Sequence, residues 1–240
     1  MPISSQELQE FSDEALLAAW RRGDMRAARI LYRRHFDAIC RFFRNKLTNL
    51  EEVADLVGET FLELVKTNAR ESRQGDRVFS FRAYLLGIAK NVLYRHFRHN
   101  YRGLRKVEMS DIDFDQCSLD ELAPRSLSSI VGGRRELDIL IKALRSLPLK
   151  DQILLEAKYF EYLMDSELAM LLDLPDSSIP GRLRGARNRL LAEVARLTAD
   201  HRRPGPDAPG ADMDTYIAEI RALIVRTNPS PVDDHGTIHP

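Results

Sequence analysis

Several features that define other classes of protein are missing from this chain. No apolar run is long enough for a membrane helix, and the first residues, MPISSQELQEF, lack the basic and then apolar order of a secretion signal. The only two cysteines, Cys40 and Cys117, lie far apart without metal-ligand spacing, which argues against a disulfide and a zinc site. We therefore expect a cytoplasmic protein with no membrane insertion, metal or cofactor.

Catalytic motifs are missing as well. There is no HExxH motif, no phosphate-cradling glycine loop, and no Ser/His/Asp or Cys/His set in a suitable context. His96 and His99 have a spacing at which two side chains share a metal, but no third ligand is evident. We expect neither an enzyme nor a small-molecule substrate.

A net charge of zero conceals a sorting of charge along the chain. Residues 1–102 hold 18 basic and 13 acidic residues, 107–123 hold six acids and no base, and 177–196 hold five arginines and one acid. Two basic modules therefore flank an acidic connector. The hydrophobic content of 44% excludes wholesale disorder, and 240 residues suffice for two small domains.

Helical periodicity dominates, and no segment alternates like a strand, so the sequence predicts an all-α fold. Ser12 is placed to cap a first helix, and Thr48 with Glu51 has the spacing of a capping box. The expected helices run over about 12–21, 24–46, 48–66, 80–102, 134–146, 149–160, 165–172 and 177–197, with a polar loop over 68–78. Residues 203–210 (RPGPDAPG) exclude regular structure, and 212–227 predict a short amphipathic helix.

The stretch from Ser80 to Lys106 is the most informative part of the chain, because it carries seven Lys or Arg and no acid. The predicted buried face of its helix consists of Phe81, Tyr84, Leu85, Ile88 and Val92. Asn91, Arg95, Arg98 and Arg102 recur at steps of four, three and four and form a stripe beside that face. A basic stripe with aromatic neighbours suits a nucleic acid. The alternative is a solvated basic face on a core helix.

Two further patterns point to binding. Glu52, Asp55, Glu59 and Glu63 form an acidic stripe at steps of three, four and four, which suits a basic partner or is a solvated face. Residues 165–197 have the cadence of a helix-turn-helix, in which Asp173-Leu174-Pro175 forms the turn and Ser177 or Ser178 caps the second helix. That helix would bury Ile179, Leu183, Ala186 and Leu190 and present Arg182, Arg184, Arg187 and Arg189 outward. The alternative here is an ordinary helical hairpin with a solvated arginine face.

Two parts of the chain resemble one known family. The run LRSLPLKDQILLEAKYFEYLMDSELAMLLDLPDSSIPGRLRGARNRLL resembles the −35-contacting domain of extracytoplasmic-function (ECF) sigma factors of bacterial RNA polymerase. The front half resembles their other domain through ALLAAWRRGDMRAARILYRRHF, ADLVGETFLELV and FRAYLLGIAKNVLYRHFR. The resemblance covers about residues 10–198. It implies a four-helix N-terminal sigma domain (10–104), a flexible acidic linker (105–133), a C-terminal helix-turn-helix domain (134–198) and a short C-terminal extension (199–240).

The resemblance also implies roles for individual residues. Contact with the polymerase core is implied for Asp55, Leu56, Glu59 and Phe61. The acidic stripe adds Glu52 and Glu63 to the expected contact residues. Contact with the −10 element, including a base flipped from the non-template strand, is implied for the loop near residue 77 and the following helix, through Arg77, Asn91, Arg95, Arg98 and Arg102. Contact with the −35 element is implied for Ser178, Arg182, Arg184 and Arg187. The partners would be the bacterial RNA polymerase core and promoter DNA, and an anti-sigma factor is a further candidate.

Three residues or pairs depart from the family pattern. Gly58 stands where Gln is usual, and Arg95 stands where Asp is common. Pro180-Gly181 replaces polar residues, so contact with the −35 element should shift to Ser178, Arg182 and Arg184 or weaken. The acidic linker has two interpretations, a mimic of nucleic acid or an ordinary solvated linker. The C-terminal extension also has two, a helix that docks on another surface or a solubilising appendage.

Two other functions stay open at this point. One is a helix-turn-helix regulator that binds DNA without contacting polymerase, which the acidic stripe would distinguish. The other is a helical scaffold that binds only proteins and would show no salt-sensitive DNA affinity.

Overall fold

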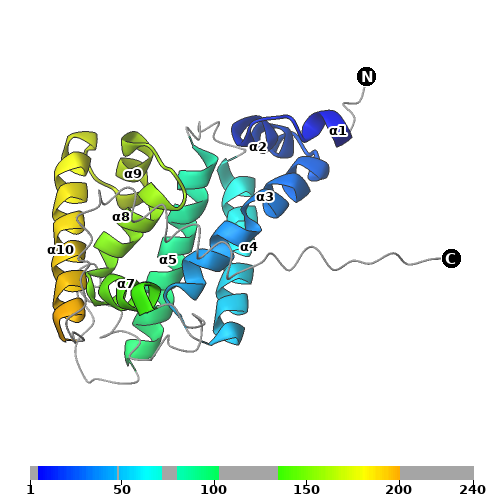
Figure 1. Ribbon diagram of the computed structural model, residues 1–240. Helices are drawn as coiled ribbons and strands as arrows, with labels where there is room; N and C mark the ends of the chain where they lie inside the picture. Colours follow the sequence, from blue (N-terminus) through cyan, green and yellow to red (C-terminus); the bar gives the residue numbers. More distant parts are fainter. Residues whose placement is uncertain (1–4, 48, 72–79, 103–134, 201–240) are drawn as a thin grey trace, which may run out of the picture.

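The computed structural model describes residues 5–47, 49–71, 80–102 and 135–200, and every regular element in these ranges is helical (Figure 1). The elements are α1 (Ser5–Leu8), α2 (Asp13–Arg21), α3 (Met25–Arg44), α4 (Leu50–Glu71), α5 (Phe81–Arg102), α7 (Arg135–Ser146), α8 (Leu149–Tyr159), α9 (Asp165–Leu172), the short 3-10 helix η3 (Asp176–Ser178) and α10 (Ile179–Asp200). The helical fold class is confirmed for this part of the chain. The predicted linker and the helix over 212–227 lie outside it. No helix within it has the length and apolar character to cross a membrane.

The helix starts follow from side-chain caps. Ser12 Oγ accepts a hydrogen bond from the Ala15 N–H of α2, at 3.2 Å, as predicted. At α4, Thr48, which was predicted to lead a capping box, lies outside the described residues. Asn49 is the residue before the helix, and its Oδ1 accepts the Glu51 N–H at 2.9 Å.

We call α1–α5 the front lobe and α7–α10 the back lobe. In the front lobe α3 packs on α2 and α4, and α4 packs on α5. Leu8 of α1, just before the domain boundary predicted at residue 10, is fully buried.

Polar contacts tie the first residues of the front lobe to α3. The Arg34 guanidinium donates to the Phe11 and Gln9 carbonyls and to Asp13. The second oxygen of Asp13 lies 2.7 Å from Nε2 of His35, which is buried against the Phe81 ring. Burial raises the pKa of Asp13, but the hydrogen bonds with His35 and Arg34 outweigh it and bring that pKa to about 2.

In the back lobe, α9 and α10 follow one another across a short turn. Asp173 ends α9 in the left-handed region with φ of 54°, and the Leu174 N–H returns to the Ala169 carbonyl at 2.9 Å. The predicted buried face of α10 is confirmed, since Ile179, Leu183, Ala186 and Leu190 are all at most 9% exposed. The second helix starts with the 3-10 turn η3 rather than with a serine cap. The Ser178 hydroxyl donates to the Pro175 carbonyl at 2.8 Å.

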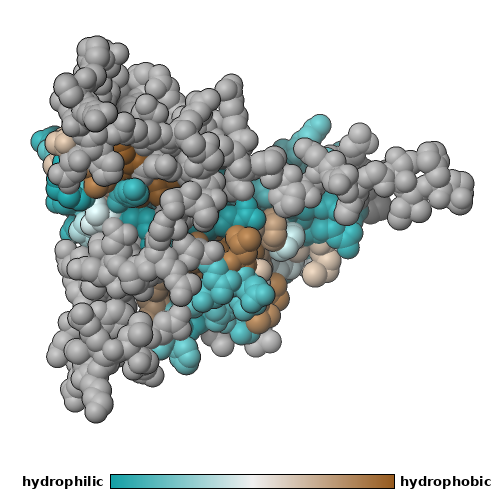
Figure 2. Space-filling model, turned by 60° about the horizontal axis from the view of Figure 1, so that its bottom comes forward, coloured by the Kyte–Doolittle hydropathy of each residue, from teal (hydrophilic) through white to brown (hydrophobic). Residues whose placement is uncertain are grey.

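Helix α5 is the front-lobe helix that meets the back lobe. It packs on α4 and α3 on one side and on α9 on the other (Figure 1). The apolar side chains of both lobes consequently belong to one continuous buried cluster. In the view from below, the visible described surface is mostly hydrophilic, with hydrophobic residues in smaller groups (Figure 2).

Candidate nucleic-acid and partner interface

The predicted acidic stripe lies on the outward side of α4. Asp55 is exposed, and Glu52, Glu59 and Glu63 are partly exposed. The inward side of the same helix consists of Val53, Leu56, Val57, Thr60, Phe61 and Leu64. The four carboxylates therefore reach the surface, where Glu63 accepts a hydrogen bond from Lys66 at 2.9 Å.

Leu56 and Phe61, also predicted as contact residues, lie on the inward side. Leu56 is 5% and Phe61 9% exposed. The Phe61 ring packs on Tyr32 of α3, with ring centroids 4.6 Å apart. The two side chains hold α4 against α3 and offer little surface.

Sequence reasoning missed two apolar residues beside the carboxylates. Leu62 is 53% and Val65 51% exposed, on the outward side of α4. Protein interfaces combine exposed aliphatic side chains with charges, so these two residues belong to the candidate surface. The signal in the sequence was that positions 62 and 65 fall outside the buried periodicity of α4.

The basic stripe of α5 is exposed where the structure describes its side chains. Asn91, Arg95 and Arg98 all face solvent, and the Arg98 Nε–H donates to the Tyr94 carbonyl at 3.3 Å. Arg102 is the last residue of α5. Arg77 lies outside the described residues.

The acidic and basic stripes meet along the seam between α4 and α5. Arg95 Nη2 donates to Glu59 Oε1 at 2.7 Å, and both side chains stay substantially exposed. Further along, His96 Nε2 lies 3.7 Å from Glu52 Oε2. Burial lowers the pKa of His96, and the neighbouring Glu52 and Glu59 only partly offset this. The two surfaces that the sequence assigned to different partners are thus electrostatic neighbours.

The arginines of α10 divide into two groups. Arg182 and Arg184 are exposed and Arg187 is half-buried. Arg189 also lies on the outward face, as predicted. It donates through Nε to Asp151 at 2.6 Å and so links α10 to α8.

An open groove runs along the first half of α10. Arg184, Arg187, Asn188 and Lys158 contribute its polar lining, and Leu183 and Pro180 contribute apolar surface. Lys158 is held by Asp165 at 2.8 Å. Arginine and amide donors on a helix-turn-helix match phosphate and base-edge acceptors of DNA. Ser178 stands at the entry to this helix, with its hydroxyl bound to Pro175.

No metal centre is found in the described part of the chain, where no group of three His, Cys, Asp or Glu side chains could hold an ion. Cys40 is half-buried, and burial raises the pKa of its thiol. Cys117 lies outside the described residues.

The family of the front lobe follows from a match to residues 31–103, which fit the family model of sigma-70 region 2. The match begins within α3 and includes α4 and α5. Helix α4 carries the acidic stripe and α5 carries the basic stripe. No curated protein matches the chain. The chain therefore carries a sigma-70 region 2 domain, and its resemblance to sigma factors is confirmed. This domain type supports binding of RNA polymerase and promoter DNA in transcription initiation.

Proposed function

We propose that this protein is a sigma factor of the ECF type, which binds the RNA polymerase core and directs it to promoters. The match of residues 31–103 to sigma-70 region 2 is the observation that carries the proposal. The front lobe binds the core and the −10 element, and the back lobe binds the −35 element. The chain itself performs no covalent chemistry.

The polymerase surface in this proposal is the outward side of α4. Its carboxylates, Asp55 and Glu59 above all, pair with basic residues of the core, and Leu62 and Val65 supply apolar anchors next to them. Leu56 and Phe61 position the helix from within.

The −10 surface is the basic stripe of α5. Arg95, Arg98 and Asn91 face solvent and suit the phosphates of a melted strand. Arg95 also contacts Glu59, so the polymerase and DNA surfaces adjoin. Arg77 and Arg102 complete the proposed set.

The −35 surface is the start of α10. Arg182 and Arg184 are exposed at the position of a recognition helix, and Arg187 lines the groove beside them. Pro180 is tolerated in this first turn because a helix start needs no N–H donor there, but it offers no hydrogen bond to a base. We therefore expect Arg182, Arg184 and Ser178 to dominate contact with the −35 element.

The proposal is tested by mixing the full chain with bacterial core polymerase and measuring run-off transcription on genomic promoter fragments. Asp55→Arg with Glu59→Arg should lower core affinity at least about tenfold, because like charges then face the core surface. Glu10→Arg, an exposed reversal elsewhere on the front lobe, is the matched control and should leave core affinity unchanged.

A second pair of variants separates this proposal from the other two functions. Arg182→Ala with Arg184→Ala should retain core binding and lose −35-dependent transcripts. A regulator that does not use polymerase would bind DNA, and the charge reversal on α4 would leave that DNA affinity unchanged. A protein-only scaffold would show no salt-sensitive DNA affinity. Absence of core binding by the wild-type chain would refute the proposal.

A further inference from the structure

An apolar stripe runs along the groove of α10. Pro180, Leu183 and Leu191 line this groove, and the Leu191 side chain is 48% exposed. Helix α10 stands at the edge of the described part of the molecule, with the rest of the back lobe on one side of it (Figure 1). Protein interfaces combine exposed aliphatic side chains with charges, so the groove has the composition of a protein-binding surface as well as that of a DNA-binding one.

Basic side chains border the apolar stripe. Arg184 is exposed and Arg187 is half-buried on α10, and Lys158 reaches the groove from α8. The acid in the lining is Asp165, which lies 2.8 Å from Lys158. The lining therefore carries three bases and one acid, which favours an occupant with excess negative charge.

The chain contains a segment of matching chemistry shortly after α10. Residues 212–227, for which the sequence predicts an amphipathic helix, lie outside the described residues. The stretch 204–220 holds four acids and no base. Asp212 and Glu219 stand seven positions apart, so in a helix they share one side, next to the apolar face. That face consists of Tyr216, Ile217, Ile220, Leu223 and Ile224. An apolar face bordered by acids complements an apolar stripe bordered by bases.

The place of this segment in the chain lets it reach the groove. Helix α10 ends at Asp200, and residues 201–211 connect it to the segment. The path from Asp200 back to Pro180 is about 30 Å along the helix, at about 1.5 Å per residue. The connecting residues span up to about 36 Å when extended. A helix over 212–227 would be about 24 Å long, compared with about 17 Å between Pro180 and Leu191. The segment is therefore long enough to cover the groove.

We propose that segment 212–227 docks into the groove of α10 and covers Arg184 and Arg187, so that the chain's own extension competes with DNA for this surface. The docking is independent of the proposed function, whereas its consequence for the −35 element rests on that function. A short helix gains most of its stability from the packing of its apolar face, and the groove supplies a surface for that face. The covalent connection keeps the segment at an effective concentration of about a millimolar, so weak docking suffices.

Docking is tested on the full chain without DNA or polymerase, by measuring the distance between two spin labels. The labels are attached at Asp176→Cys, an exposed position before α10, and at Ala218→Cys, near the middle of the segment and off its apolar face. Cys40 and Cys117 are replaced by alanine. The docked segment should give one distance centred below about 25 Å, because the middle of the groove lies about 15 Å along α10 from residue 176 and packed helices lie about 8–10 Å apart. An undocked segment should give a broad distribution centred beyond about 40 Å, because the end of α10 is itself about 36 Å away and a flexible chain adds to this.

Variants on both sides of the contact identify the surfaces. Ile220→Ser with Leu223→Ser in the segment, and separately Leu191→Ser in the groove, should each shift the distance to the long, broad distribution, because each removes apolar contact. Val225→Ser, which lies off the predicted apolar face, is the matched control in the segment. Met25→Ser, at a side chain of α3 that is 66% exposed, is the matched control in the described residues. Both controls should keep the short distance, and far-UV circular dichroism checks that every variant folds.

Three results would overturn the docking. The first is a long distance in the wild type. The second is a short distance that survives the segment variant or the Leu191→Ser change, because the segment would then use another surface or none of these contacts. The third is a short distance in a mixture of chains that carry one label each, because the segment would then dock on a second copy.

The second arm measures the affinity for a short fluorescent DNA duplex of mixed sequence by anisotropy. A chain whose groove is covered two thirds of the time binds DNA about threefold more weakly than an uncovered one. The Ile220→Ser, Leu223→Ser variant should therefore bind the duplex at least about threefold more tightly than the wild type, and Val225→Ser should not. Equal affinity despite a released segment would refute the competition. A chain that binds no DNA in any variant would refute the proposed −35 role together with the competition, while the spin labels alone still decide the docking.

Discussion

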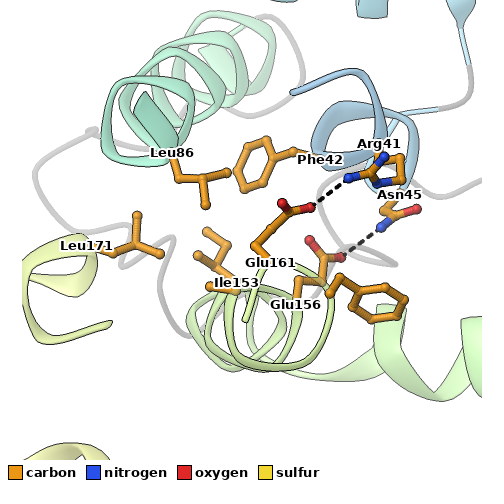
Figure 3. Close-up of a pocket in the computed structure, with 10 residues that line it drawn as sticks. Arg41, Phe42, Asn45, Leu86, Ile153, Glu156, Glu161 and Leu171 are labelled. Atoms are coloured by element: carbon orange, nitrogen blue, oxygen red, sulfur yellow. Dashed lines mark hydrogen bonds and ion pairs between the residues drawn. The ribbon is translucent and has the colours of Figure 1, made fainter. Parts of the chain in front are cut away.

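Replacing Lys46 by methionine tests how the ion pair between the lobes acts on stability. Lys46 is fully buried, and its ammonium donates to Glu156 Oε2 of α8. The variant leaves the Glu156 carboxylate buried, with the Asn45 amide still donating to it (Figure 3). Removing one partner of a buried pair destabilises a protein by about 3–5 kcal/mol. The two lobes can instead separate, which lets water hydrate Glu156. The loss in the free energy of unfolding therefore cannot exceed the free energy that holds the two lobes together. We therefore expect either a loss of this size or an early separation of the lobes.

The two outcomes are distinguished by urea denaturation with two probes. Trp20, the single tryptophan, lies on α2 and reports on the front lobe, whereas far-UV circular dichroism reports on both lobes. Coincident transitions at a lower midpoint indicate that the two lobes still unfold together. Transitions that no longer coincide indicate that the lobes have become independent. The double variant Lys46→Met with Glu156→Met should recover most of the lost stability, because an apolar pair suits a buried position.

Acid should rescue the single variant. Burial raises the pKa of Glu156 above its ordinary value of 4.5, and Lys46 partly opposes this, so loss of Lys46 raises it further. The folded variant then binds a proton that the unfolded chain has released. Its stability should be fully present below about pH 4.5 and fall as the pH rises towards the folded-state pKa, by up to roughly 1.4 kcal/mol per unit. A Lys46→Met protein with the wild-type midpoint at pH 7, and no gain at pH 5, would refute the reasoning.

Three smaller predictions concern the front lobe. Asp13→Asn should lower the free energy of unfolding by about 2 kcal/mol at pH 6, because the pKa of Asp13 lies at about 2 rather than 3.8. Urea titrations should show the wild type losing this contribution as the pH falls from about 4 through 2, whereas the variant should show no such loss. Gly58→Ala should stabilise α4 by about 1 kcal/mol, because alanine has a higher helix propensity than glycine. The added carbon meets no atom within 4 Å apart from the nearby backbone of its own helix, and an unchanged urea midpoint would contradict the prediction. Glu59→Gln should release Arg95 and strengthen single-stranded DNA binding by the free protein up to about fivefold at low salt; equal affinity by fluorescence anisotropy would show that the pair does not compete with DNA.

Local sequence signals predicted the helices well where caps and periodicity agree. α2, α9 and the buried face of α10 follow the predicted pattern. The end of α4 was placed too early, near residue 66, and Asn68 was assigned to a loop. The helix continues to Glu71 because Asn68 is buried and accepts a hydrogen bond from Arg21 of α2 at 3.2 Å. A contact between residues so distant in sequence leaves no periodic signal.

The exposed charges of α4 and α5 were partly predictable from helical spacing. Exposed charges at helical spacing identified the outward side of α4 and the stripe of α5. Periodicity could not tell whether α5 is covered on a second side, and Leu86 and Lys90 face the back lobe rather than solvent. Arg189 is exposed, as predicted, yet it also binds Asp151 of α8, and periodicity gave no sign of that contact.

The least predictable feature of the fold is a fully buried lysine. Charged residues are rarely buried without a partner, and the partner of Lys46 lies 110 positions away in the sequence. A contact kept only for stability would be served as well by two apolar residues. An ion pair differs in that each member is soluble in water once the pair is broken.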